Sequence, residues 1–293
     1  MKNLLFIFNP MAGKGLIVNK IYSVLAFYTE KGYIVTALPT GRREVLEEVF
    51  NNQIGNFQLI VCAGGDGTLN GVISICMETG CRLPIAYLPV GSTNDFAKTL
   101  GYSNDFNENL ENSCVDVYHK IDIGKFGNKY FVYVAAFGSL AEVSYSTSQS
   151  SKNLLGHLAY LLKGIQKITD LKAYTLKMEY EDGCIEGTFV LGLIMNSLSI
   201  GGFKNPVSDA VILNDGLFEV LLIKKPSNLS ELQTIIIDLI SQKVDGEMFY
   251  YIQTSHLVIR SEPMGWSLDG EFGGVVEAAE VWNCREAIEI KGS

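Results

Sequence analysis

A glycine-rich loop that contains an acid and a hydroxyl follows a short apolar segment. Residues 64–68 read Gly-Gly-Asp-Gly-Thr and come directly after the apolar run 59–63. Glycine lets backbone amides approach a phosphate, and a helix that starts here adds the positive end of its dipole. A tight turn capped by Asp66 and Thr68 is the alternative. That alternative explains poorly why both side chains share one turn, so the loop predicts phosphate binding, with Asp66 near Mg2+ or a proton to be abstracted.

Two further loops follow strand-like segments. The apolar run 84–89 leads into residues 91–95, Gly-Ser-Thr-Asn-Asp, which combine a turn glycine with donors, acceptors and an acid at a helix start. The first apolar run, residues 4–8, leads into residues 9–15. This loop lacks the spacing GxxxxGK[ST], so Lys14 is either a point charge near phosphate or a solvated lysine. Ligands bind where strands end in open α/β sheets, so the loops 64–68 and 91–95, which both carry an acid and a hydroxyl, predict a phosphate site.

Four segments occur in an order typical of one family. They are Asn9-Pro10 with Gly13-Lys14-Gly15, then residues 64–70, residues 89–97, and Leu268-Asp269-Gly270-Glu271. The chain resembles the diacylglycerol kinase catalytic-domain family over nearly its whole length. The resemblance is to the branch of soluble bacterial lipid kinases, with sphingosine and ceramide kinases as more distant relatives. One departure is Gly71, where many members carry Glu.

The resemblance implies an ATP-dependent, Mg2+-dependent lipid kinase and a set of site residues. The implied catalytic residues are Glu271, Asp66 and Asp95. Glu271 would accept the proton of the lipid hydroxyl, with Asp66 as the rival, and Asp66 and Asp95 would organise magnesium. The expected ATP-binding residues are Asn9, Lys14, Gly64, Gly65, Asp66, Gly67, Thr68, Gly91, Ser92, Thr93 and Asn94. Asp122 matches an acid that ties the two halves of the site together, and an ordinary strand-end acid is its alternative.

Two other acidic segments carry expectations. Asp269 and Glu271 stand at i and i+2, so in an extended segment both would project from one face. Residues 214–216, Asn-Asp-Gly, predict a β-turn. The resemblance implies that Asp215 holds a structural magnesium there, together with the carbonyls of Ile212 and Leu217, and a plain turn is the competing interpretation.

The pattern of apolar residues changes near residue 122 and predicts two domains. Residues 1–122 alternate strands and helices, which predicts a three-layer α/β nucleotide-binding domain, and residues 123–283 predict a mainly antiparallel β-sandwich that binds lipid. The tail, about 284–293, is expected to return to the first domain, and the active site is expected in the cleft between the domains. The expected strands are 4–8, 33–38, 58–63, 84–88, 130–136, 173–180, 184–195, 217–223 and 256–259, and the expected helices are 16–31, 42–51, 69–78, 94–100, 153–168 and 229–240.

Charge and composition exclude several functions. A net charge of −9 argues against nucleic acid as a partner. No apolar run reaches the ~18 residues that span a bilayer, and the apolar start of the chain predicts a strand, not a signal sequence. The six cysteines form no metal pattern and are expected to be reduced. These features predict a cytoplasmic enzyme that associates transiently with the membrane; a homodimer stays open.

The apolar face of segment 153–168 suggests how such an enzyme would reach lipid. Flanking lysines and the Ser-rich stretch 144–151 suggest a lipid-entry rim with a lid, whereas periodicity alone fits a core helix equally well. The predicted function is transfer of the γ-phosphate of ATP to the hydroxyl of a lipid such as diacylglycerol. The alternatives are a NAD kinase-like enzyme with a soluble acceptor and a non-catalytic nucleotide- or lipid-binding module.

Overall fold

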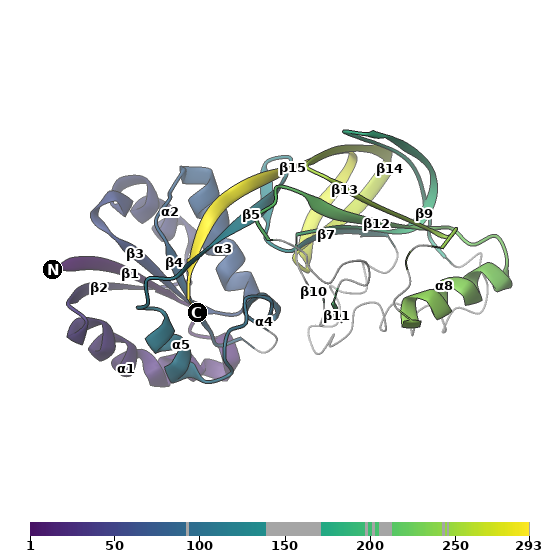
Figure 1. Ribbon diagram of the computed structural model, residues 1–293. Coiled ribbons are helices and arrows are strands. Elements are labelled where there is room, and N and C mark those ends of the chain that lie inside the picture. The colour runs from purple at the N-terminus through teal and green to yellow at the C-terminus, as the bar shows by residue number, and fades with distance from the viewer. Residues whose placement is uncertain are drawn as a thin grey trace. The chain divides into compact units, whose positions relative to one another are not determined.

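The computed structural model describes residues 1–91, 94–138, 171–196, 199–200, 203–204, 213–241, 244 and 246–292. The predicted lipid-entry segments 144–151 and 153–168 lie outside the described residues. The chain divides into two compact units (Figure 1). Unit 1 comprises Met1–Ile121 and Glu286–Ser293, and unit 2 comprises Asp122–Arg285.

A parallel sheet forms the centre of unit 1. Its strands are β1 (Lys2–Phe8), β2 (Tyr33–Pro39), β3 (Leu59–Gly64) and β4 (Ile85–Pro89), in the order β4-β3-β1-β2. Every residue of β3 is buried, as expected for a strand covered on both faces. The end of the last strand extends the sheet, because Ile290 pairs in parallel with Ile85 beside β4.

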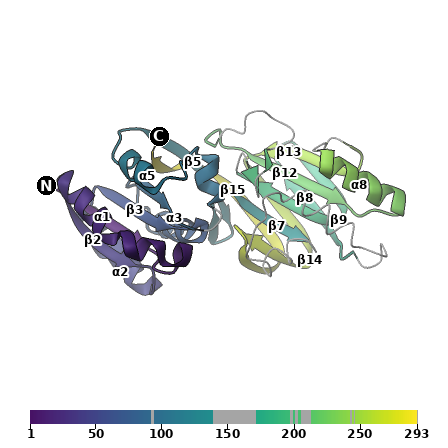
Figure 2. The same ribbon diagram turned by 90° about the horizontal axis from the view of Figure 1, so that it is seen from below.

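Helices cover both faces of this sheet (Figures 1 and 2). The helices α1 (Leu16–Glu30) and α5 (Phe106–Asn112) lie on one face, and α2 (Arg43–Asn52) and α3 (Asp66–Thr79) lie on the other. Helix α1 presents Ile17, Val24 and Tyr28 to the core at helical spacing. Short elements complete the unit: α4 (Asp95–Thr99), η1 (Ala12–Gly15) and η2 (Ile54–Asn56).

Helix α3 begins earlier than predicted, and α5 was not predicted. The pattern placed the start of α3 at Leu69, but the helix starts at Asp66 because the carbonyl of Gly65 accepts hydrogen bonds from the amides of Thr68 and Leu69. Helix α5 is short, and Asp105 caps it by accepting from the amides of Asn107 and Glu108. Its apolar stripe is too short to give a periodic signal.

Unit 2 consists mainly of antiparallel strands. They are the end of β5 (Tyr118–Phe126), β6 (Lys129–Phe131), β7 (Val134–Gly138), β8 (Tyr174–Tyr180), β9 (Gly183–Met195), β12 (Phe218–Lys224), β13 (Phe249–Thr254), β14 (His256–Leu268) and most of β15 (Glu271–Lys291), with the two-residue pair β10 (Ser199–Ile200) and β11 (Phe203–Lys204). The predicted fold class, α/β followed by antiparallel β, is confirmed.

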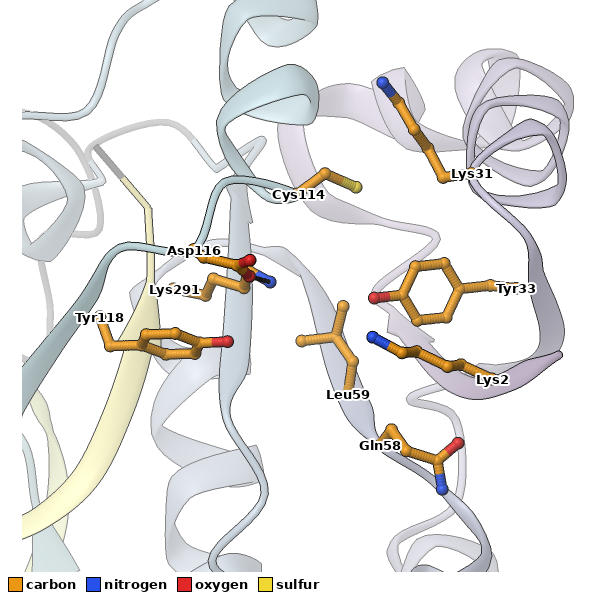
Figure 3. Close-up of a pocket in the computed structure, with 9 residues that line it drawn as sticks. All are labelled: Lys2, Lys31, Tyr33, Gln58, Leu59, Cys114, Asp116, Tyr118 and Lys291. Carbon is orange, nitrogen blue, oxygen red and sulfur yellow. Dashed lines mark hydrogen bonds and ion pairs between the residues drawn. The ribbon is translucent and has the colours of Figure 1, made fainter.

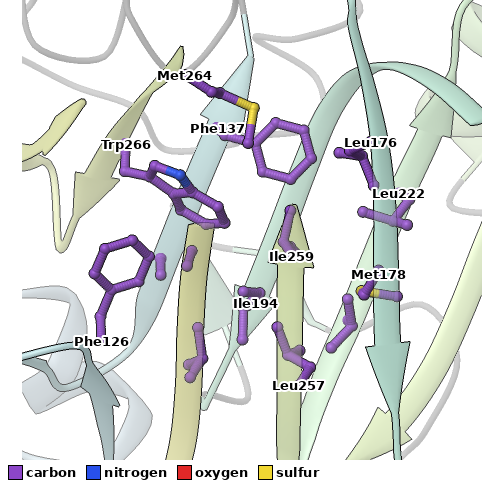
Figure 4. Packing of buried hydrophobic residues seen from close by; sticks show 14 of the residues in the cluster. Phe126, Phe137, Leu176, Met178, Ile194, Leu222, Leu257, Ile259, Met264 and Trp266 are labelled. Atoms are coloured by element: carbon purple, nitrogen blue, oxygen red, sulfur yellow. The ribbon is translucent and has the colours of Figure 1, made fainter. Parts of the chain in front are cut away.

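The apolar core of unit 2 lies on two sides of its strands. One side is rich in aromatic rings: Trp266 lies 4.8 Å from Phe126 and 5.0 Å from Phe137 between ring centroids (Figure 4). The predicted helix near residue 230 is confirmed as α8 (Leu229–Ser241). It covers the other side through Leu232, Ile235 and Leu239.

Several strands of unit 2 differ from the predictions. The expected strand 130–136 is two strands, β6 and β7, which are separated at Val132 and Tyr133 because their amides bond a carboxylate instead of a neighbouring strand. Strands β5 and β13 were not predicted, and neither was the length of β15. Strands β8 and β9 form a hairpin with Glu181 and Asp182 as its loop, because Tyr180 pairs with Gly183. Within the described part of the chain, no helix has the length and apolar character needed to cross a bilayer.

Candidate active site

Three loops of unit 1 leave the carboxyl edge of its parallel sheet. Strands β1, β3 and β4 end at Phe8, Gly64 and Pro89 and are neighbours in the sheet. The chain turns to opposite sides after β1, since β2 and β3 flank that strand. The loops after β1 and β3 therefore meet at the switch point where ligands bind in open α/β sheets.

The glycines bring two of these backbones very close together. A Cβ atom added to Gly91 would lie 2.5 Å from the Cα of Gly65, and one added to Gly65 would lie 3.3 Å from the Cα of Gly91. A Cβ on Gly64 would collide with the side chain of Thr68. These loops therefore require glycine for packing, and the same property leaves backbone amides open to a ligand.

Asp66 joins the second loop to the third. It is the first residue of α3, and its Oδ1 accepts a hydrogen bond of 3.1 Å from the amide of Phe96 in α4. Part of this carboxylate is thus already used to hold the two loops together. Such an acid also lies at the positive end of the α3 dipole, where anions are stabilised.

Asn9 and Lys14 belong to the first loop. The Nδ2 of Asn9 donates to the Oγ1 of Thr68 at 3.3 Å, and its Oδ1 accepts from the amide of Met11 at 2.9 Å. Lys14 is exposed and has a φ of 58°, between two glycines that also have positive φ. A left-handed lysine costs of order 1 kcal/mol, so the loop holds a conformation that its sequence disfavours.

The third loop contains a buried amide oxygen. Asn94 has a φ of 50° and donates from Nδ2 to the carbonyl of Gly91 at 3.0 Å. Its Oδ1 is buried and accepts no hydrogen bond from the described residues. Ser92 and Thr93 lie outside the described residues, as does the side chain of Asp95, the residue that begins α4.

A two-residue hairpin turn separates the carboxylates of Asp269 and Glu271. Leu268 pairs with Glu271, and Asp269 and Gly270 between them have φ values of 49° and 83°. The expectation that both acids share one face is wrong, because the segment turns here and is not extended. Asp269 is buried, and Glu271 is exposed at the start of β15.

Asp269 is a structural carboxylate. It accepts from the amides of Val132 at 2.7 Å, Tyr133 at 3.0 Å and Val134 at 2.9 Å. These three bonds satisfy the acid and fix the break between β6 and β7. By contrast, Glu271 makes no hydrogen bond or ion pair with the other described side chains and is open to a reactant.

Asp122 binds the turn that contains Asp215. Asp122 is fully buried; its Oδ2 accepts from the amide of Gly216 at 2.6 Å, and its amide donates to the carbonyl of Leu213 at 2.8 Å. Asp215 accepts from the amide of Leu217 at 2.9 Å, which is the geometry of an Asx-turn. Ile212 lies outside the described residues. The described chain contains no cluster of three or more His, Cys, Asp or Glu side chains suited to a metal.

Sequence reasoning missed one buried acid close to this turn. Glu219 on β12 is 1% exposed, and its Oε1 accepts a long bond of 3.4 Å from Gln253, whereas its Oε2 has no partner in the described structure. Burial raises the pKa of Glu219 to about 7, and the charge of Asp215 adds to this. No motif marks Glu219, because a single acid in an apolar strand usually faces solvent.

Comparisons with known proteins agree on one family. A model of the diacylglycerol kinase catalytic domain matches residues 3–126. The chain is 31% identical to a diacylglycerol kinase of Bacillus subtilis (strain 168) over 94% of this chain and 92% of the relative. It is 32% identical to one of Staphylococcus haemolyticus (strain JCSC1435) over 97% and 86%.

Solved structures share the fold. A diacylglycerol kinase structure from Bacillus anthracis str. Sterne superposes with a TM-score of 0.78 at 19% identity, over 100% of this chain and 97% of that one. The sequence relatives match both units at 31% and 32% identity. The three loops described above lie within the matched region. The chain therefore belongs to the diacylglycerol kinase family.

Proposed function

We propose that this protein transfers the γ-phosphate of ATP to the hydroxyl of diacylglycerol. Membership of the family makes the chain a lipid kinase, and a kinase of this family uses ATP as phosphate donor. The observation that carries the proposal is the meeting of three glycine-containing loops at the carboxyl edge of the unit 1 sheet. Neither the relatives nor these loops favour the NAD kinase-like alternative or a non-catalytic module.

The triphosphate would bind to the loops of unit 1. Backbone amides of residues 64–68 and 91–94 would hold its oxygens, and the side chain of Thr68, oriented by Asn9, would add a hydroxyl. Lys14 would contribute a point charge. The close approach of Gly65 to Gly91 fits this use, because glycine leaves no side chain between the backbone amides and the phosphate oxygens.

Magnesium suits the donor set of the same loops. Asp66 and Asp95 would hold it directly or through water, since Mg2+ prefers a few carboxylates together with phosphate oxygens. When bound, it would neutralise charge on the transferring phosphoryl group. Phosphoryl transfer then needs little further from the protein than positioning and a base.

Glu271 is the better candidate for the base. Asp66 already accepts a hydrogen bond from Phe96, whereas the carboxylate of Glu271 is exposed and uncommitted among the described residues. A general base must reach the hydroxyl whose proton it takes. Glu271 would hold that proton at a carboxylate oxygen while the lipid oxygen attacks the γ-phosphorus. Asp122, the first residue of unit 2, would link the two halves of the site, and its bond from the amide of Gly216 holds its carboxylate in place.

A structural magnesium at Asp215 is a separate part of the proposal. Asp215, the carbonyl of Leu217 and the carbonyl of Ile212 would be its protein ligands. If so, Mg2+ without nucleotide should raise the melting temperature of the parent protein and leave that of Asp215→Asn unchanged. An equal shift in both proteins would remove Asp215 as a ligand.

The lipid would be taken from a membrane surface. The hydrophobic segment 153–168 would form the entry rim, so Leu158→Ser with Leu162→Ser should raise KM for vesicle-borne diacylglycerol and spare a short-chain soluble analogue. Equal loss on both substrates, in a folded variant, would assign this segment to core packing.

The central experiment is a panel of acceptors with labelled ATP and Mg2+. Diacylglycerol, phosphatidylglycerol, a sphingoid base, an isoprenoid alcohol and NAD would be compared at equal concentration. Diacylglycerol should give the highest kcat/KM. Preference for NAD would overturn the lipid assignment, and no transfer to any acceptor by a protein that binds ATP would favour a binding module.

A further inference from the structure

A cavity lies in unit 1 at the sheet edge opposite to the phosphate loops. It has a volume of about 250 Å3, and the residues that start three parallel strands, Lys2 of β1, Tyr33 of β2 and Leu59 of β3, line it. The phosphate loops follow the other ends of β1 and β3. Strands of this length separate the two edges by about 20 Å at ~3.3 Å per residue, so one small ligand cannot occupy both places.

A buried ammonium group faces this cavity. The side chain of Lys291 is 7% exposed, and its Nζ lies 3.2 Å from the Oδ1 of Asp116 and 5.3 Å from the ring centroid of Tyr118. Burial lowers the pKa of Lys291, but hydrogen bonds with Asp116 and Tyr118 outweigh that effect and raise it above the usual value. Lys291 is therefore positive at neutral pH and needs an anion beside it.

The anion that Lys291 now has is loosely held. The side chain of Asp116 is 88% exposed, and such exposed carboxylates contribute little to an ion pair. Asp116 can rotate into water and leave the Nζ of Lys291 to a ligand. A buried cation whose partner is solvent-exposed is a preformed position for an incoming anion.

Further donors point into the same space. Figure 3 shows the ammonium group of Lys2 and the hydroxyls of Tyr33 and Tyr118 directed toward the region around Leu59, with Lys31 at the rim. Lys2 forms no ion pair with the residues that the structure describes, and Lys31 pairs with exposed Glu111 at 3.8 Å. Three lysines against one aspartate line the cavity, in a protein whose net charge is −9.

We propose that this cavity binds a small phosphate-bearing anion, either inorganic phosphate or a phosphate monoester. Two inward-directed ammonium groups match a dianion better than a carboxylate, and two tyrosine hydroxyls can donate to the remaining oxygens. The volume lies below the ~300 Å3 at which pockets for larger ligands begin, so the cavity has room for a phosphate group with at most a small substituent. The site does not depend on the proposed kinase activity.

Amide NMR of the full chain separates this site from the nucleotide loops. Titration with inorganic phosphate should shift the amides of Lys2, Tyr33 and Leu59 saturably, independently of any change at residues 64–68. Lys2→Gln should weaken this binding by about tenfold or more, because one charge-assisted hydrogen bond is lost. Tyr33→Phe should weaken it less, and it keeps the ring contact with Tyr28.

The control is Lys225→Gln, which removes the same charge from an exposed position in unit 2 and should leave phosphate binding unchanged. Lys2 and Tyr33 are chosen because replacing buried Lys291 threatens folding. Equal affinity for phosphate in the parent and Lys2→Gln would overturn the proposal, and so would the absence of a saturable shift at the cavity together with no Lys2-dependent response to phosphatidic acid.

The source of the phosphate is tested separately. Co-sedimentation with phosphatidylcholine vesicles, with and without phosphatidic acid, is compared for the parent and Lys2→Gln. A response to free phosphate alone identifies a soluble anion. A Lys2-dependent response to phosphatidic acid without a response to free phosphate identifies a lipid headgroup, and response to neither removes the site.

Discussion

Carboxylates near the candidate site differ mainly in the hydrogen bonds that they already accept from the protein. Asp269 accepts from the backbone amides of Val132, Tyr133 and Val134, Asp66 accepts from the amide of Phe96, and Glu271 is exposed at the start of a strand. An acid that is fully bonded in the resting protein is a poor proton acceptor. The residue environment therefore ranks Glu271 above Asp66, the rival base in the sequence-based expectation.

Glu271→Gln should keep ATP binding and lower kcat by ~10²–10⁴, the usual scale for loss of a general base. The control is Glu277→Gln, an exposed acid farther along β15, which should keep full turnover. ATP affinity by calorimetry and single-turnover transfer to diacylglycerol are the measurements. Turnover of Glu271→Gln within a few-fold of the parent would promote Asp66 to the role of base.

Glu219 predicts a pH dependence of stability. Because its folded pKa is raised to about 7, the folded state binds a proton more tightly than the unfolded state does. The protonated carboxyl therefore stabilises the folded state at low pH. This contribution is lost as the pH rises from the ordinary pKa of Glu in the unfolded chain to the raised pKa in the folded protein. Glu219→Gln should raise the free energy of unfolding at pH 8 by ~1–3 kcal/mol relative to the parent, and by much less at pH 5.

Urea unfolding at both pH values measures this difference, and exposed Glu181→Gln serves as the control. A gain of the same size at pH 5 and pH 8 would show that Glu219 does not titrate in this range.

At the scale of elements, glycines in the loops allow the loops to pack together and also leave backbone amides open for the proposed phosphate binding. One substitution can disturb both. Gly65 packs against Gly91, so a side chain at Gly65 disturbs the loops even without a ligand. Gly71 lies in α3, the helix that begins directly after Gly65. It is exposed, and a Cβ added to it would meet no atom within 4 Å among the described residues. This pair of glycines therefore separates a local effect on the loops from a general effect on α3.

Gly65→Val should abolish measurable ATP binding, and Gly71→Val should retain it, while both variants keep a cooperative unfolding transition. Binding of a fluorescent ATP analogue and thermal unfolding are the two measurements. If folded Gly65→Val binds ATP as the parent does, the nucleotide site lies elsewhere.

The elements that sequence reasoning identified are those with a strong local signal. The strands of unit 1 are continuous apolar runs and were located within about two residues, whereas α3 was placed too late because Asp66, Gly67 and Thr68 disfavour a helix interior. The break at Val132 and Tyr133 was missed, since it depends on Asp269, more than a hundred residues away. The burial of Glu219 was also missed, because the residues next to it in the sequence do not indicate that its side chain is buried.

Across the whole molecule, β15 connects the two units. Its first part, which includes Val275, belongs to unit 2, and its last residues, which include Ile290, extend the sheet of unit 1. The family resemblance anticipated a returning tail, and composition alone did not. Parallel pairing with β4 is a long-range contact that no local pattern specifies.

Ile290→Ala should lower the free energy of unfolding by ~2–5 kcal/mol, because Ile290 is fully buried beside β4. Val275→Ala on the same strand, where the side chain is 60% exposed, should change it by less than ~0.5 kcal/mol. Denaturant unfolding of both variants tests the comparison. Equal effects would mean that the end of β15 contributes little to unit 1.

The path of β15 has a consequence for synthesis of the protein. During translation residues 1–121 emerge from the ribosome first, and domains that emerge early generally fold first. Unit 1 nevertheless lacks its edge partner for β4 until Ile290 and Lys291 have been made, after every residue of unit 2. During translation β4 therefore presents an unpaired strand edge, of the kind on which chains aggregate, and closing it is among the last steps of folding.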